Sequence, residues 1–190
     1  SDVLERLGLK KRQYILVSAH REENIDIEDN FMDLMNAINH IAKTYNMPVI
    51  YSTHPRSKKF IEMRDFKFHP LVQSMKPFGF LDYNMLQMNA YCVLSDSGTL
   101  SEESAMLGFP GVLLRTSTER PEVLDKGSVV IGGIRGEDVE RATRLAVSMY
   151  DNNEEVVLSP DYNDTNVSVK VVKLIQSYTD IVNRTVWLKR

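Results

Sequence analysis

The hydrophobic positions of this chain alternate between short continuous apolar runs and longer stretches in which apolar residues recur with a helical period. Six short runs have the length and the β-branched or aromatic content of strands. They are Gln13–Ser18, Pro48–Ser52, Val72–Met75, Tyr91–Ser95, Gly111–Leu114 and Ser128–Ile131. Because most of these runs are apolar at nearly every position, the pattern predicts parallel strands that are covered on both faces.

Amphipathic helical patterns lie between the predicted strands. One of them, Asn30–Tyr45, carries Phe31, Leu34, Ile38 and Ile41 on a single stripe. The other predicted helices are Ser57–Met63, Asp82–Asn89, Leu100–Leu107, Pro121–Lys126, Gly136–Tyr150 and Val167–Val186. Strands that alternate with helices in this way predict an α/β fold, in which a doubly wound parallel sheet lies between two helical layers.

Composition narrows the class of protein. The chain has 190 residues, enough for one domain with a sizeable core. The formal net charge is −3 and charges of both signs are interspersed, so we expect no nucleic-acid partner. No apolar stretch approaches the length of a membrane span, and we expect no membrane insertion.

The single cysteine, Cys92, lies in an apolar run, which predicts a buried thiol and a cytoplasmic location. A helical pattern is already under way at Ser1–Gly8, so we expect a fragment of a longer protein.

Distinctive polar motifs follow the predicted strands, at the edge where parallel sheets bind ligands. Ser18–Asn24 reads SAHREEN, and four ionisable groups follow a buried strand directly. Arg21 can clamp a phosphate or carboxylate, and His20 can donate a hydrogen bond or a proton. These features favour a functional loop over a merely solvated one. For His54, which follows the second strand, a ligand contact and a structural cap at the strand end remain equal alternatives.

The stretch from Asp96 to Glu103 is the strongest local signal. Gly98 allows close approach of a phosphate, which the Ser97 hydroxyl and the first N–H groups of the next helix can hold. The alternative is an ordinary turn in which Ser or Thr caps the helix. One of Glu102 and Glu103 suffices to complement the helix dipole, and the other, one turn in, can accept both hydroxyls of a ribose.

Two more loops contribute candidates. Arg120 follows the fifth strand and can reach phosphate or sugar, although by itself a surface ion pair with Glu119 is the simpler interpretation. The aromatic loop Pro77–Tyr83 offers a ring that can stack on a uracil base, while most of its other rings are expected in the core. Neither a metal-ligand cluster nor a nucleophile–base pair is evident from spacing, so the chain is expected to supply half of an active site.

Together these motifs resemble the UDP-N-acetylglucosamine 2-epimerases. The resemblance rests on SAHREEN at Ser18–Asn24, HP at His54-Pro55, DSGTLSEE at Asp96–Glu103, GFPGVLLR at Gly108–Arg115 and TERPE at Thr118–Glu122. It implies a three-layer Rossmann-like parallel sheet, the C-terminal half of the two-domain fold of B-type glycosyltransferases (GT-B). Residues 1–190 would form one UDP-binding domain, the N-terminal domain would be absent, and the last helix, about residues 167–186, would pack toward it.

The resemblance also implies residue roles. Ser97, Gly98 and Thr99 would hold the diphosphate, and Glu103 the ribose. The remaining roles fall to Phe78 and Tyr83 at the uracil, Arg21 in substrate binding, Arg120 at the phosphates or sugar, and His20 as the catalytic residue. Many members carry a second glycine in place of Thr99. The SAHREEN motif and the SGT at Ser97–Thr99 resemble more closely the branch that acts on UDP-2-acetamido-2,6-dideoxy-L-hexoses for capsule or O-antigen synthesis.

The implied chemistry inverts C2 of a UDP-N-acetylamino sugar by anti elimination of UDP to a 2-acetamidoglycal, followed by re-addition. It implies no metal and no redox cofactor, further catalytic carboxylates on the absent domain, an inactive fragment, and a homodimer when full length. Two alternatives stay open: the donor-binding domain of a B-type glycosyltransferase, and a non-catalytic nucleotide-sensing or assembly module.

Overall fold

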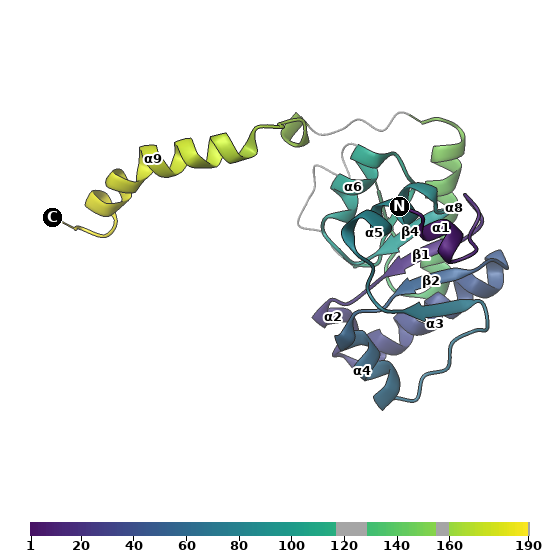
Figure 1. Cartoon of the computed structure of the whole chain (residues 1–190). Coiled ribbons are helices and arrows are strands. Elements are labelled where there is room, and N and C mark those ends of the chain that lie inside the picture. Colours follow the sequence, from purple (N-terminus) through teal and green to yellow (C-terminus); the bar gives the residue numbers. More distant parts are fainter. Residues whose placement is uncertain (117–128, 155–159, 190) are drawn as a thin grey trace. The chain divides into compact units, whose positions relative to one another are not determined.

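The computed structural model of the chain describes residues 1–116, 129–154 and 160–189 (Figure 1). The chain divides into two compact units, Ser1–Leu158 and Ser159–Arg190, and each is described by itself. The predicted helix Pro121–Lys126 and the predicted phosphate contact Arg120 lie outside the described residues.

The first unit is built on a six-stranded sheet. Its strands are β1 (Ile15–Ser18), β2 (Val49–Ser52), β3 (Val72–Met75), β4 (Cys92–Ser95), β5 (Gly111–Leu113) and β6 (Val130–Ile131). The order is β3-β2-β1-β4-β5-β6 and every neighbouring pair is parallel. Ile15 pairs with Val49 on one side and with Cys92 on the other. The order reverses between β1 and β4, which confirms the predicted doubly wound, Rossmann-like sheet.

Helices follow the strands as predicted, with differences at their ends. The unit contains α1 (Val3–Arg6), α2 (Glu22–Ile25), α3 (Glu28–Tyr45), α4 (Pro55–Met63), α5 (Phe80–Asn89), α6 (Leu100–Leu107) and α8 (Gly136–Asp151). The one-turn helix α2 occupies the SAHREEN motif and was not predicted, because four mostly polar residues carry no helical period. Helix α4 begins at Pro55, two residues before the predicted start, since proline fits the first turn of a helix.

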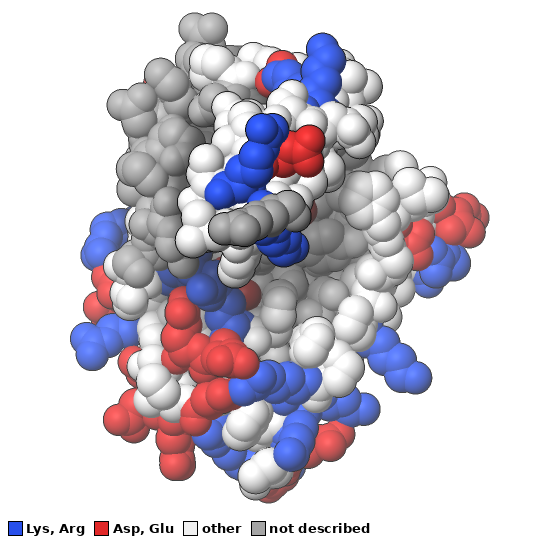
Figure 2. Space-filling view, turned by 90° about the vertical axis from the view of Figure 1, so that its left-hand side faces the viewer, with Lys and Arg blue, Asp and Glu red and all other residues white. Residues whose placement is uncertain are grey.

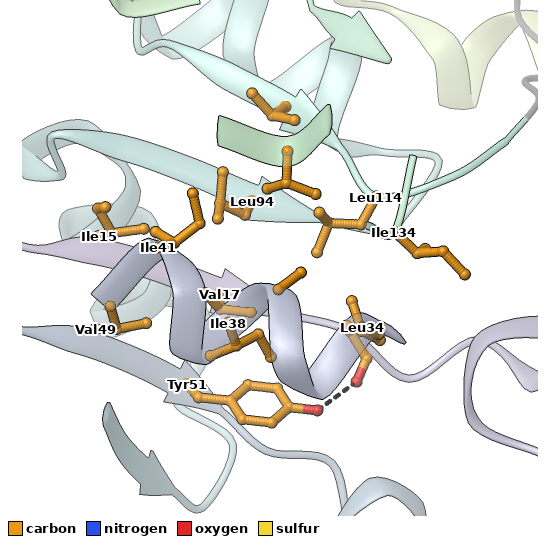
Figure 3. Packing of buried hydrophobic residues seen from close by; sticks show 14 of the residues in the cluster. Ile15, Val17, Leu34, Ile38, Ile41, Val49, Tyr51, Leu94, Leu114 and Ile134 are labelled. Carbon is orange, nitrogen blue, oxygen red and sulfur yellow. Dashed lines mark hydrogen bonds between the residues drawn. The ribbon is translucent and has the colours of Figure 1, made fainter. Parts of the chain in front are cut away.

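The core lies on both faces of the sheet. Figure 1 shows α3 and α8 on one side, and α5 and α6 on the other. Figure 3 shows Leu34, Ile38 and Ile41 of α3 lying against strand residues such as Val17 and Val49. Alternate strand residues face opposite layers, which explains why the strands are apolar at successive positions. Cys92 is buried as predicted, and burial raises the pKa of its thiol to about 12.

The second unit holds a short 3₁₀ turn, Pro160–Tyr162, and the long helix α9 (Val167–Thr185). Helix α9 confirms the predicted last helix. Its apolar residues recur with a helical period, yet none of its side chains is buried. The apolar stripe consists of Val171, Leu174, Ile175, Tyr178, Ile181 and Val182. The described residues of this unit do not themselves cover the stripe, and an amphipathic helix of this kind has the pattern of a segment that packs against another surface.

Candidate functional site

The carboxyl ends of the strands gather the polar motifs along one edge of the sheet. At the end of β1, Ser18 pairs with Ser95 at the end of β4. The turns that follow these two strands therefore lie side by side, where the strand order reverses. His20 comes from one turn and Asp96 from the other. This is the position at which open parallel sheets bind their ligands.

Asp96 ties the two turns together. Its side chain is fully buried, and its Oδ2 accepts hydrogen bonds from the backbone N–H of His20 (2.9 Å) and of Arg21 (2.8 Å). The amide of Asn24 donates to the same oxygen at 3.2 Å, and also to the carbonyl of Leu114 after β5 at 3.0 Å. Three neighbouring strands are thus connected through two buried side chains. The motifs contained both residues, but the sequence indicated no role for either.

The turn after β1 is fixed from its other side as well. The carbonyl of Ala19 accepts hydrogen bonds from the hydroxyls of Tyr51 (3.0 Å; the dashed line in Figure 3) and Ser57 (2.9 Å), both of which are buried. The backbone at His20 is therefore anchored from β2, β4 and α4 at once. Such a turn presents the His20 side chain from a rigid support.

His20 and His54 lie against each other. Their ring centroids are 5.2 Å apart, and the rings are inclined by 28°. Nδ1 of His54 accepts the backbone N–H of Arg56 at 3.2 Å, so His54 caps the start of α4. Of the two alternatives for His54, the structure contains the cap, although at the helix rather than at the strand end. The His54 ring also lines the same hollow as His20.

A hollow of about 210 Å³ brings His20, Phe78 and Tyr83 together, along with His54. Phe78 follows β3 and is half-buried, as is Tyr83 on α5. Burial raises the pKa of Tyr83 to about 12, a hydrogen bond with Ser18 opposes this shift, and the charges of Glu103 and Asp96 add to it. The predicted aromatic pair and the predicted histidine therefore share one concave surface.

Glu103 provides a second carboxylate, besides Asp96, in the first turn of α6. Oε1 of Glu103 accepts the Thr99 hydroxyl at 2.9 Å, and Oε2 accepts the side-chain N–H of Gln87 at 2.5 Å. The Ser97 and Thr99 hydroxyls are 2.9 Å apart. Thr99 occupies the N-cap position of α6 but makes no side-chain cap, because its hydroxyl binds Glu103 instead. Ser97, Gly98, Thr99 and Glu103 thus form one continuous polar surface.

Gln87 was missed by sequence reasoning. It lies on α5, is fully buried, and has no polar neighbour in the sequence that indicates a site. Its side-chain oxygen makes no hydrogen bond within the described residues. The sequence offered only one indication of its role, which is that a polar glutamine occupies a core-facing position of the α5 helix. A buried amide that orients a carboxylate is a positioning group.

Charged side chains surround this edge. Glu22 and Asp26 bind the Arg56 guanidinium at 2.9 and 2.5 Å, and Glu23 lies 3.1 Å from Nε of Arg21. Figure 2, which looks onto this side of the molecule, shows acidic side chains gathered next to basic ones. Exposed pairs of this kind contribute little to stability. Their guanidinium groups lie where an anionic ligand can exchange for the carboxylates.

Arg115 is a further residue that sequence reasoning did not single out. It follows β5, is 3% exposed, and its Nε lies 3.5 Å from Glu23. Its position directly after the apolar run Gly111–Leu114 could have indicated a charged residue at the ligand-binding edge. A buried guanidinium at the carboxyl edge adds positive charge beside the turns after β1 and β4.

The described residues hold no group of three or more His, Cys, Asp or Glu side chains placed to bind a metal ion. None of the described helices is both long enough and apolar enough to cross a membrane.

Known proteins are similar to this chain in sequence and in fold. The chain matches the sequence profile of the UDP-N-acetylglucosamine 2-epimerase family over residues 1–176. A curated UDP-N-acetylglucosamine 2-epimerase from Methanocaldococcus jannaschii is 33% identical over 141 residues, which are 71% of this chain and 38% of that protein.

Solved structures that are similar to this chain come from the same family as the sequence relatives. A UDP-N-acetylglucosamine 2-epimerase from Rickettsia bellii aligns with all of this chain and 51% of its own, at 38% identity and a TM-score of 0.83. The M. jannaschii enzyme, crystallised with UDP-GlcNAc and UDP, aligns with 93% of this chain and 49% of its own, at 26% identity and a TM-score of 0.78. The chain spans about half the length of these structures. It belongs to the UDP-N-acetylglucosamine 2-epimerase family.

Proposed function

We propose that this chain forms the UDP-binding half of a UDP-sugar 2-epimerase. The observation that carries the proposal is the polar surface from Ser97 to Glu103, which lies at the carboxyl edge beside the hollow of His20, Phe78 and Tyr83. A phosphate seat, a carboxylate for ribose and aromatic rings for a base are the parts that a nucleoside diphosphate requires. The relative crystallised with UDP-GlcNAc and UDP supports the same ligand class.

In this proposal the diphosphate binds at the turn after β4. Gly98 leaves room for the phosphate, and the hydroxyls of Ser97 and Thr99 and the first backbone N–H groups of α6 donate to it. Ribose hydroxyls replace the Thr99 hydroxyl at Glu103, whose second oxygen stays fixed by Gln87. Phe78 and Tyr83 contact the uracil. Arg21 and Arg120 contact the phosphates or the sugar.

The proposed reaction is an elimination followed by an addition. A base takes the proton from C2, the C1–O bond breaks with its electron pair going to UDP, and a C1=C2 double bond forms. UDP then adds back to C1 and a proton returns to C2 on the opposite face. The residues of this chain stabilise the leaving diphosphate, and His20 faces the sugar or its phosphates as a proton-transfer group.

We further propose that residues 1–190 act together with a preceding domain, toward which α9 packs. The support is the apolar stripe of α9, which its own unit does not cover, and the length of the relatives, of which this chain spans about half. In a polypeptide that carries both domains, hydrogen exchange of the α9 amides is expected to be slow. Fast exchange throughout α9 in that polypeptide would contradict the packing.

The finer assignments remain predictions. They are the branch that acts on 6-deoxy-L-hexose derivatives, a role in surface polysaccharide synthesis in the cytoplasm, and a homodimer. The SAHREEN motif at Ser18–Asn24 and the side chain of Thr99 are the observations that favour this branch.

The test of the reaction is turnover by the two-domain polypeptide in deuterium oxide, with UDP-N-acetylglucosamine or its 6-deoxy-L relatives, followed by proton NMR. The proposal predicts deuterium at C2 in recovered UDP-sugar without any acceptor. Release of UDP only when an acceptor is added would instead identify a glycosyltransferase. The chain by itself is expected to bind UDP without turnover.

A further inference from the structure

Asp96 has no role in the binding scheme above, yet it is the most completely buried charged group at this edge of the sheet. All three of its hydrogen bonds go to one oxygen, Oδ2. The other oxygen, Oδ1, is buried and has no hydrogen-bond partner within the described residues. A buried carboxylate oxygen of this kind requires a donor or a cation.

The group that faces Oδ1 is the His20 imidazole. Its Nδ1 lies 3.7 Å from Oδ1, just beyond hydrogen-bonding distance. The His20 side chain is 43% exposed, and the described part of the chain makes no hydrogen bond to either of its ring nitrogens. A small rotation of this exposed ring closes the gap between Nδ1 and Oδ1. The backbone stays in place during this rotation, because hydrogen bonds to Asp96 and to the Ala19 carbonyl hold it on both sides.

We infer that Asp96 is the positioning residue of His20: its Oδ1 accepts the Nδ1–H of the imidazole and thereby directs an unprotonated Nε2 toward the hollow shared with Phe78 and Tyr83. The inference rests on the proposed function only in giving His20 a ligand to act on. A buried carboxylate that accepts a hydrogen bond from one ring nitrogen of a histidine fixes the tautomer and leaves the other nitrogen free to accept a proton.

The other histidines provide a built-in contrast. Nδ1 of His54 accepts a backbone N–H from Arg56, and Nδ1 of His69 accepts one from Leu71 at 3.3 Å. Nε2 of His40 lies 2.7 Å from Glu140. Each of these contacts favours a proton on Nε2. Among the four histidines of the chain, His20 alone is therefore expected to carry its proton on Nδ1 when neutral.

The experiment is nitrogen-15 NMR of the imidazole rings in this chain without ligand, at about pH 8.5, two units above the ordinary pKa of histidine. His20 is assigned with the His20→Gln variant. The expected result is a protonated Nδ1 and an unprotonated Nε2 for His20, with the reverse pattern for the other three. A His20 that shows the same pattern as the others would overturn the inference.

Asp96→Asn gives a second readout. The asparagine oxygen can keep the three donors of Oδ2, while its NH₂ group replaces Oδ1 and donates to Nδ1 of His20. His20 is then expected to change to the Nε2–H form, and His54 to stay unchanged. An unaltered His20 tautomer in a folded Asp96→Asn protein would also overturn the inference. If that variant fails to fold, the spectrum of the unmodified chain still decides.

Neither readout requires UDP. If the tautomer pattern is as expected but UDP does not bind, the proposed function fails alone. If UDP binds at Ser97–Glu103 but His20 carries its proton on Nε2, the positioning role of Asp96 fails alone.

Discussion

Two carboxylates that follow β4, Asp96 and Glu103, sit seven residues apart in the sequence and in contrasting surroundings. Asp96 is fully buried, and two of its three hydrogen bonds come from the backbone of another loop. Glu103 is half-buried, and both of its oxygens are bound by side chains, those of Thr99 and Gln87. The same chemical group thus serves as scaffold in one place and as an accessible acceptor in the other.

The difference lies in what can be exchanged. A backbone N–H cannot leave Asp96 without moving the turn after β1, and that turn is fixed by Tyr51 and Ser57 as well. The Thr99 hydroxyl can rotate away from Glu103 and leave room for a ligand hydroxyl. Substitutions at Asp96 should therefore reduce stability, and substitutions at Glu103 should reduce binding.

The largest expected effect is the loss of stability in Asp96→Ala. Three buried donors lose their acceptor, which lowers the free energy of unfolding by about 3 kcal/mol. Urea denaturation followed by circular dichroism measures the change. Glu22→Ala, which removes an exposed carboxylate nearby, serves as the control and should cost less than about 0.5 kcal/mol. A loss at Asp96 no larger than that of the control would remove the contrast.

Next in size is the loss of UDP affinity in Glu103→Gln. Glutamine can still pair with Gln87 and Thr99, so the free energy of unfolding should hardly change. Its neutral amide oxygen accepts hydrogen bonds from the ribose hydroxyls more weakly than the charged carboxylate does, and the Kd for UDP is expected to rise about tenfold in calorimetry. The matched control is Glu102→Gln on the same turn of α6, which should leave the Kd nearly unchanged. Equal effects of the two variants would contradict the role of Glu103.

Gln87→Leu should give a smaller loss. The variant removes the donor that fixes Oε2 of Glu103, so the carboxylate must be ordered by the ligand itself. We expect the Kd for UDP to rise about threefold. We also expect little change in stability, because the unpartnered oxygen of Gln87 disappears with it. Affinity equal to that of the unmodified chain would show that Glu103 needs no support from α5.

The smallest expected effect is on the pH dependence of stability and concerns Tyr83, whose pKa is raised by burial and by the charges of both carboxylates. Burial raises its pKa to about 12, and the charges of Glu103 and Asp96 add to the shift. Below about pH 10 the hydroxyl is protonated in both the folded and the unfolded chain, so its contribution to stability is fully present. Between pH 10 and 12 the unfolded chain loses this proton first, and stability falls.

Tyr83→Phe should therefore make the alkaline loss of stability less steep in urea denaturation between pH 9 and 11. Part of the slope should remain, because burial also raises the pKa of Tyr45 to about 12. A slope that Tyr83→Phe leaves untouched would mean that the hydroxyl is accessible to solvent in the folded chain.

The sequence predicted the sheet and its edge well, because hydrophobic period and strand-end position are local properties. It also selected Ser97, Thr99, Glu103, His20, Phe78 and Tyr83, which the structure gathers into two adjoining polar and aromatic surfaces. The anchors of these surfaces were not predictable. Asp96 finds its partners 75 and 76 residues away, and Gln87 reaches Glu103 from a different helix. Thr99 was expected as a helix cap or phosphate contact, and its bond to Glu103 depends on the geometry of the first turn.

The most direct test of the account is a titration of this chain with UDP, followed by amide NMR. We expect the largest shifts at Ser97, Gly98, Thr99 and Glu103, with further shifts at Phe78 and Tyr83. Amides at the opposite edge of the sheet, around Gly108–Gly111, should not move. Shifts confined to that opposite edge, or none at millimolar UDP, would contradict the claim that the carboxyl edge binds the nucleotide.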